Sequence, residues 1–237
     1  MDLPAGSKRK VSMSKKIMLL ALAAVSAVMF VLPAAASANW GVTPGNAVFH
    51  GTTEGGSLSA EGEPTITCLG PNHITGSYDG SGTTGTLSLT FTECHAFILG
   101  ITRRCTSGPE PKTENTITTS GTFHNVTITS GKRGVLVTPA ETTVRCQSAL
   151  HPIKVTGNVI GELLSPTGAC PLGPFTKAEL GFSTTGGIQN DKTIDGSATE
   201  YNLTAETEGT GIKKESGESA TEVIEFTEAV TIDCSTP

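Results

Sequence analysis

Cysteine is the residue type in this chain whose number and spacing indicate chemistry most directly. The sequence of 237 residues contains six cysteines: Cys68, Cys94, Cys105, Cys146, Cys170 and Cys234. No two of them form a C-x-x-C pair, and no histidine lies at metal-ligand spacing from a cysteine pair. An even number of cysteines is typical of disulfides in a chain that is exported, and the first 38 residues have the order of a signal for export, so we predict disulfides and no metal site.

Six cysteines allow fifteen connectivities, of which the spacing favours one. We predict Cys94–Cys105, because this pair would close a short hairpin. Cys68–Cys146 would join two strand ends with matching contexts, Thr-Ile-Thr-Cys and Thr-Val-Arg-Cys. Cys170–Cys234 is the pair that remains. In the chain-entropy model each disulfide would stabilise the fold by about 3–4.5 kcal/mol.

A catalytic nucleophile is not indicated. Such a site needs Ser, Cys or Thr beside a base and an oxyanion donor. The sequence has no G-x-S-x-G motif, and its histidines lie in unrelated contexts: His50, His73, His95, His124 and His151. Its glycines occupy turn positions and form no phosphate-cradling or dinucleotide motif. We therefore predict no catalytic residue and no cofactor.

Carboxylates could support other chemistry. A pair of them could hydrolyse a glycosidic bond, and Glu93 and Glu162 are the strongest candidates, although solvated surface is the preferred interpretation for both. Two acidic loops, 79–82 and 190–196, could offer oxygen ligands to calcium. Neither fits the EF-hand pattern, and a tight turn explains each more simply.

The first 38 residues have the order of a cleavable secretory signal peptide. Five basic residues between Lys8 and Lys16 precede the uncharged apolar run 17–32, and Ala36-Ser37-Ala38 offers a small-residue cleavage site. The alternative, a transmembrane anchor, needs about 20 apolar residues. Met13 could be the true start, because residues 13–38 form a complete leader. No later stretch is apolar enough to span a membrane, so we expect a secreted or cell-envelope protein without a membrane span after cleavage.

Composition narrows the class of the remaining chain, residues 39–237. Removing the leader removes five of 16 basic residues and one of 22 acidic ones, which leaves a net charge of about −10. Nucleic acid is therefore excluded as a partner, because its binding requires a basic face. The 37 threonines all lie in this part and favour strands. Disorder is the alternative that the low aromatic content allows.

Apolar and polar residues alternate with a period of two, as expected for strands with one buried face. Leu87, Leu89 and Phe91 share one parity, and so do Ile224, Phe226, Val230 and Ile232 near the C-terminus. Glycine-rich turns separate such segments. Glu215, Glu218, Glu222 and Glu225 have helical spacing, but Gly217 and the β-branched residues that follow favour a strand. We predict a single all-β domain, an antiparallel sandwich or a barrel-like fold.

A weak internal repeat is present. Cys68 followed by 74–80 is similar to Cys146 followed by 155–161, which suggests a duplicated half of about 63–105 and 141–185. Chance similarity in a chain rich in threonine and glycine is the alternative.

Several of these segments together resemble a group of uncharacterised secreted β-rich proteins of soil actinobacteria. The segments are the leader, Trp40, and the stretches 65–68, 87–94 and 155–161. The resemblance implies a bacterial, extracellular protein and carries no activity or site residue.

The sequence thus predicts a non-enzymatic extracellular or cell-envelope domain with a structural or binding role. Its partner is unknown; a cell-wall or extracellular glycan or a protein would fit. The alternative is a secreted hydrolase acting on glycans. Trp40 either anchors the mature N-terminus in the sheet or stacks on a sugar, and anchoring is the preferred interpretation.

Overall fold

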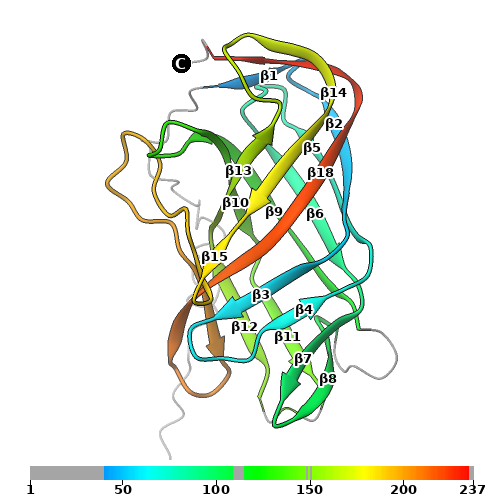
Figure 1. Cartoon of the computed structure of the whole chain (residues 1–237), viewed down its shortest axis with the longest axis vertical. Helices are drawn as coiled ribbons and strands as arrows, with labels where there is room; N and C mark the ends of the chain where they lie inside the picture. Colours follow the sequence, from blue (N-terminus) through cyan, green and yellow to red (C-terminus); the bar gives the residue numbers. More distant parts are fainter. Residues whose placement is uncertain (1–39, 109–114, 148, 150, 235–237) are drawn as a thin grey trace, which may run out of the picture. The chain divides into compact units, whose positions relative to one another are not determined.

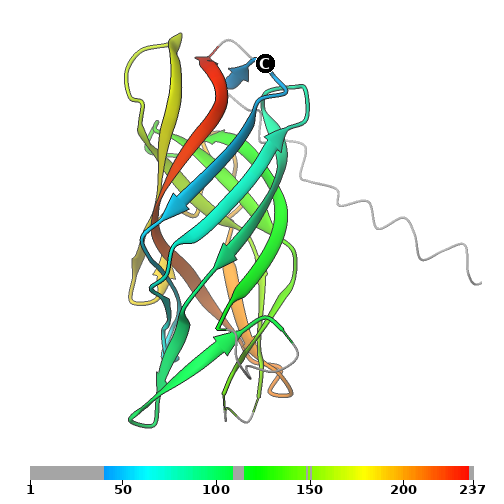
Figure 2. The ribbon, with the colours of Figure 1, turned by 90° about the vertical axis from the view of Figure 1, so that its right-hand side faces the viewer.

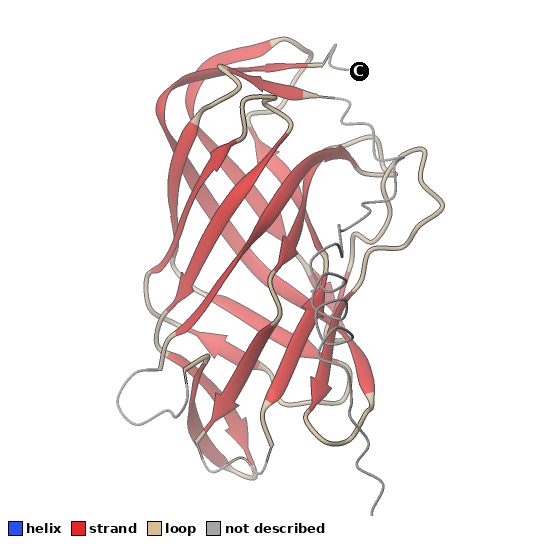
Figure 3. Ribbon diagram, turned by 180° about the vertical axis from the view of Figure 1, so that it is seen from behind, coloured by secondary structure: helices blue, strands red, loops and turns tan. Residues whose placement is uncertain are grey.

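The computed structural model describes residues 40–108, 115–147, 149 and 151–234. All regular secondary structure in these ranges is β (Figure 3), as the sequence predicts. The predicted leader lies outside the described residues. No helix in the described part of the chain has the length and apolarity needed to cross a membrane.

Eighteen strands make up the described structure (Figure 1). They are β1 Gly41–Thr43, β2 Val48–Thr53, β3 Gly56–Ala60, β4 Ile66–Cys68, β5 Asn72–Tyr78, β6 Thr84–Phe91, β7 Cys94–Ile98, β8 Ile101–Thr106, β9 Ile117–Thr127, β10 Arg133–Pro139, β11 Thr142–Cys146, β12 Ile153–Gly157, β13 Val159–Ser165, β14 Leu172–Phe182, β15 Thr184–Thr185, β16 Ile188–Gln189, β17 Leu203–Thr207 and β18 Lys213–Asp233.

Eight of these strands close into an antiparallel barrel. Their order is β14-β13-β10-β9-β6-β5-β2-β18, and β18 pairs again with β14 to complete the circle. We call this barrel the first ring. The predicted all-β antiparallel fold is confirmed, and of the two architectures that the sequence left open, the barrel is the one found.

The remaining long pairings follow a second closed path, the second ring. It runs β18-β17-β12-β11-β8-β7-β4-β3 and returns to β18. The two rings share β18, a strand of 21 residues. Its residues 213–220 pair with β17 and β3, whereas residues 220–232 pair with β14 and, over 223–226, with β2. Figure 2 shows the two sets of strands one above the other.

Alternating side chains fill the interior of each ring. In the first ring the core includes Phe49, Leu87, Phe123 and Ile224. Aromatic rings fit there because facing positions are glycine: a Cβ atom on Gly76 would lie only 2.4 Å from the Phe49 ring. The second ring has its own core of smaller side chains, among them Ile66, Val144, Val155 and Leu203.

Trp40 anchors the start of the described chain, as the preferred interpretation of the sequence proposed. Its side chain is 3% exposed and packs in the core of the first ring. The indole Nε1 donates a hydrogen bond of 2.9 Å to the carbonyl oxygen of Val126. An indole buried in this way presents no face to an external sugar.

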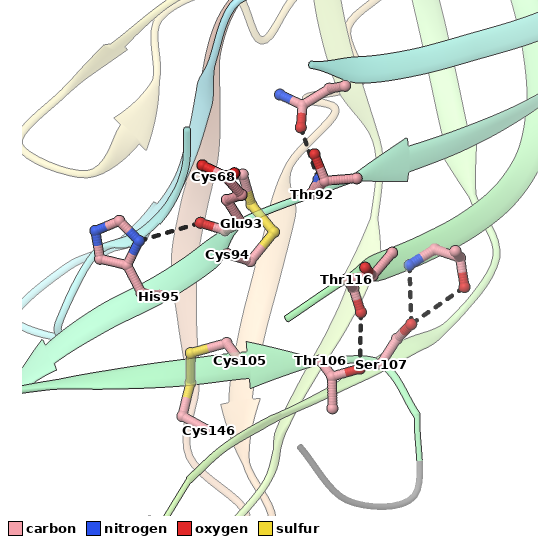
Figure 4. Close-up of a disulfide and its surroundings, with 12 residues drawn as sticks. Cys68, Thr92, Glu93, Cys94, His95, Cys105, Thr106, Ser107, Thr116 and Cys146 are labelled. Carbon is pink, nitrogen blue, oxygen red and sulfur yellow. Dashed lines mark hydrogen bonds between the residues drawn. A yellow bond between two sulfur atoms is a disulfide. The ribbon is translucent and has the colours of Figure 1, made fainter. Parts of the chain in front are cut away.

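Two of the three predicted disulfides are wrong. The structure pairs Cys68 with Cys94, Cys105 with Cys146 and Cys170 with Cys234, and only the last was predicted. Cys68 lies opposite Cys94 in the β4–β7 register, and Cys105 lies opposite Cys146 in the β8–β11 register (Figure 4). All three disulfides fit the oxidising compartment that the sequence predicts.

The correction has a geometric cause. The β7–β8 register, in which His95 lies opposite Arg104, would place Cys94 opposite Cys105 one step further, so the predicted hairpin is present. The four cysteines therefore lie in a row across four adjacent strands. Joining the inner two would leave the outer two about three strand spacings apart, roughly 14 Å, which is beyond the reach of a disulfide. Only pairing each inner cysteine with its outer neighbour oxidises all four.

Peptide mapping without reduction should recover Cys68 linked to Cys94 and Cys105 linked to Cys146. Replacing both members of the Cys105–Cys146 pair by alanine should lower the free energy of unfolding by about 2–4 kcal/mol, because the open chain gains entropy when unfolded. Denaturant titration checks this value. Recovery of a peptide that links Cys68 to Cys146 would contradict the strand order β4-β7-β8-β11, because that order holds these two cysteines too far apart to bond.

Candidate functional site: two carboxyls inside the barrel

The residues that could do chemistry lie on the strand that both rings share. Along β18 the even-numbered side chains face the interior: Ser216, Ala220, Glu222 and Ile224 are all less than 10% exposed. Glu218 has the same parity and lines the interior cavities. Because successive side chains of a strand point to opposite faces, the parity that buries Ile224 also turns Glu222 and Glu218 inward.

Two cavities lie inside the rings, next to these carboxyls. The first, of about 60 Å³, lies in the first ring and is lined by Trp40, Phe123, Phe175, Ala178 and other mostly apolar residues. The second, of about 90 Å³, is lined by second-ring residues that include Leu58, Ile66, Val144 and Leu203. Leu89, Val137 and Glu218 line both cavities, so the two adjoin where the rings meet. Glu222 lines only the first.

Neither carboxyl has a hydrogen-bond or ion-pair partner among the described residues. Oε1 of Glu218 is fully buried without a partner, as is Oγ of Ser216 two residues before it. Most buried polar groups in proteins are paired, because an unpaired one loses its hydration without compensation. The unpaired carboxyls of Glu218 and Glu222, which line a cavity, therefore require an explanation.

Burial sets the protonation state of the pair. Loss of hydration raises the pKa of Glu218 well above the ordinary glutamate value. The pKa of Glu222 is also raised, first by burial and then by the negative charge of Glu218. Both effects disfavour the ionised form, so the carboxyls hold protons at a pH where surface glutamates do not. A protonated carboxyl can donate a hydrogen bond to an oxygen or nitrogen atom in the cavity.

The other polar side chains around the first cavity are satisfied within the protein. The Tyr78 hydroxyl donates to Oδ1 of Asn125 at 3.2 Å, and Nδ2 of Asn125 donates to the carbonyl oxygen of Gly82 at 3.1 Å. Burial raises the pKa of Tyr78 far above its ordinary value, so it stays a neutral donor. Among the polar side chains that line the first cavity, Glu218 and Glu222 are therefore the ones left to meet a ligand.

The carboxylates that the sequence singled out lie elsewhere. Glu93 is exposed, and Glu162 forms a surface ion pair with Lys132 at 2.8 Å. The loop at Asp79 is a tight turn, as predicted: its carboxylate accepts hydrogen bonds from the backbone N–H and the hydroxyl of Ser81, which lowers its pKa. The structure does not bring these residues together.

Glu218 and Glu222 were missed, although the sequence contains a signal for them. The predicted parity of Ile224 and Phe226, continued toward the N-terminus, reaches Glu222 and Glu218. The stretch was predicted to be a strand, but glutamate is usually exposed, and this argued against an inward position for either residue.

Comparison of the chain with protein-family models, with curated proteins and with solved structures finds no match.

The buried pair should make stability depend on pH in a defined direction. In the unfolded chain both glutamates lose their protons near pH 4.3, whereas in the folded chain they keep them to higher pH. The unfolded state therefore releases protons first, and the free energy of unfolding falls as pH rises from about 4.3 toward the raised pKa values, by up to about 1.4 kcal/mol per pH unit for each group.

The double variant Glu218→Gln/Glu222→Gln removes both titrations and keeps the side-chain shape. Compared with the unaltered protein, it should be relatively more stable at pH 8 than at pH 4, as measured by denaturant titration at each pH. Glu179→Gln, on the exposed face of β14, is the matched control and should leave the profile unchanged. Parallel profiles for the double variant and the unaltered protein would show that the two carboxyls ionise normally in the folded state.

Proposed function

We propose that this chain is an extracellular binding protein that holds a small, mainly apolar molecule with one polar group inside its barrel. The observation that carries the proposal is the pair of adjoining apolar cavities, with Glu218 on the wall of both and Glu222 on the wall of the first. Neither carboxyl has a hydrogen-bond partner among the described residues, and Oε1 of Glu218 is fully buried. An eight-stranded barrel is the size at which the interior either fills with side chains or holds one small ligand.

The cavity dimensions support a small ligand. A cavity needs roughly 10–15 Å³ to hold a single water molecule, and the two cavities measure about 60 and 90 Å³. Aliphatic and aromatic walls favour the apolar part of a ligand, because burying it removes apolar surface from water. A protonated carboxyl favours a neutral acceptor, such as a hydroxyl, ketone or ester oxygen.

The extracellular location rests on several observations that agree. Three disulfides, together with the lack of a membrane-spanning helix in the described residues, are consistent with a protein outside the cytoplasm. The signal-peptide order of residues 1–38 and the resemblance to secreted actinobacterial proteins support export from a bacterium. Export and bacterial origin are parts of the proposal.

Hydrolysis of a glycan is the alternative function. Two carboxyls with raised pKa values would suit the acid in such a reaction. However, sugar hydroxyls need many polar partners, and the walls around Glu218 and Glu222 are mostly apolar. The proposal of a binding protein therefore takes precedence.

The sole tryptophan provides the test, because Trp40 lines the first cavity. Straight-chain alcohols and methyl ketones should produce a saturable change in Trp40 fluorescence, and alkanes of equal length should bind more weakly. In Glu218→Gln/Glu222→Gln this preference should change, whereas binding of the alkanes should not.

A cavity-filling variant separates interior from surface binding. Ala178 lines the first cavity and is 6% exposed, so Ala178→Leu should weaken binding by about tenfold or more while costing about 1–3 kcal/mol of stability. Glu179→Leu adds the same side chain on the outer face of β14 and should leave binding unchanged. No saturable signal with any ligand, or equal effects of the two variants, would refute the proposal. Release of reducing sugars from a glycan, abolished by Glu222→Gln, would favour the hydrolase.

A further inference from the structure

The turn between β7 and β8 displays three large apolar side chains to solvent. Leu99 is 95% exposed, Phe97 67% and Ile101 52%. They lie within five consecutive residues at the lower end of the strands in Figures 1 and 2. Single exposed apolar residues are ordinary, but a contiguous group of this kind usually marks an interaction site.

The backbone at Leu99 strengthens this interpretation. Leu99 and Gly100 both have positive φ, at 51° and 81°, in a two-residue hairpin turn. Such a turn favours asparagine, aspartate or glycine, because a side chain with a Cβ atom is crowded in the left-handed region. Leucine at this position therefore lowers local stability and exposes apolar surface at the same time. Neither effect benefits folding.

The apolar side chains cover both faces of the hairpin and its tip. Phe97 has the parity opposite to that of Ala96, which is 2% exposed and faces the core of the second ring. Ile101, opposite Ile98 in the register, lies on the face opposite to Phe97. A hairpin that packs flat on a protein needs apolar side chains on one face only. A hairpin that enters an apolar medium needs apolar side chains on both faces and at its tip.

Basic residues follow directly after the apolar tip. Arg103 lies opposite Ala96 and Arg104 opposite His95, so the two arginines belong to the two faces of the hairpin. Arg104 is exposed, and Arg103, on the face of Ala96, is half-buried. Neither forms an ion pair with another residue that the structure describes. Arg145 lies on the adjacent strand, opposite Thr106. Three of the four arginines beyond residue 38 therefore surround this hairpin in a chain of net negative charge. Glu93, the nearest acidic residue along the chain, precedes the base of β7.

The base of the hairpin is fixed to the neighbouring strands. Cys94 and Cys105 are fully buried and are joined to Cys68 and Cys146 on the two sides (Figure 4). The hairpin is thus held at its base while its tip extends into solvent.

We propose that the β7–β8 hairpin docks the protein on an anionic lipid bilayer. Phe97, Leu99 and Ile101 enter the interfacial layer, and Arg103 and Arg104 bind lipid phosphates at the level of the headgroups. An apolar tip with a basic collar matches both layers of such a surface, the acyl boundary and the phosphates. A second copy of the chain is a poorer partner, because three side chains at a narrow tip supply far less than the roughly 800 Å² per partner of a stable protein interface.

The test is co-sedimentation of the exported protein, its N-terminus verified by mass spectrometry, with lipid vesicles. It should bind vesicles of phosphatidylcholine with phosphatidylglycerol and bind pure phosphatidylcholine vesicles much more weakly. High salt should weaken the binding, because the arginine contribution is electrostatic.

Leu99→Asn is the decisive variant. Asparagine suits positive φ better than leucine, so the variant should be at least as stable as the unaltered protein, yet it should bind anionic vesicles about tenfold more weakly. Arg103→Gln/Arg104→Gln should lose the preference for anionic lipid. Leu69→Asn changes another exposed leucine, in the β4–β5 connection, and should leave binding unchanged.

Three results would overturn the proposal. They are absence of binding to anionic vesicles, equal loss of binding in Leu99→Asn and Leu69→Asn, and a concentration-dependent dimer that Leu99→Asn dissociates. The last result would assign the hairpin tip to self-association.

Discussion

The length and continuity of β18 are the constraint on which the structure depends. One strand of 21 residues completes both rings, so its register fixes how each ring closes and how the two are placed on each other. Because the strand continues across the junction without a change of parity, the same face stays interior from Ser216 to Ile224, and Val230 and Ile232 are buried again near its end. A shift by one residue would expose Ile224 and Ile232 and bury Glu225 and Thr231.

That constraint also explains how two carboxyls come to lie in an apolar interior. On a strand with one wet face, Glu218 and Glu222 could have been placed outward at no energetic cost. Their inward parity imposes desolvation on both, and the fold bears this cost without pairing either of them within the described residues. Such locally unfavourable features are concentrated at functional sites in proteins, where they interact with a ligand. The same argument applies to Leu99, which has a positive φ and is exposed to solvent where the two carboxyls are enclosed.

Two of the three disulfides stabilise the second ring. Cys68–Cys94 and Cys105–Cys146 both lie in the second ring, whose core consists of small aliphatic side chains and cysteine. The first ring has most of the aromatic residues, with Phe123 packed edge-on against both Phe49 and Tyr78. Covalent links thus reinforce the ring with less apolar surface to bury, and they fix the base of the exposed hairpin.

The sequence by itself determined the strand class, the antiparallel pairing, the turn at Asp79 and the strand that became β18, and it favoured the anchoring role of Trp40. These follow from period-two alternation and turn residues, which are local properties of the chain. Three features were decided by tertiary structure alone. They are the closure of the sheet into a barrel and not a sandwich, the pairing of the cysteines, and the inward position of Glu218 and Glu222. Each of these depends on which strands become neighbours across the sheet. Strand order is set by packing between residues far apart in sequence, and no local pattern encodes it.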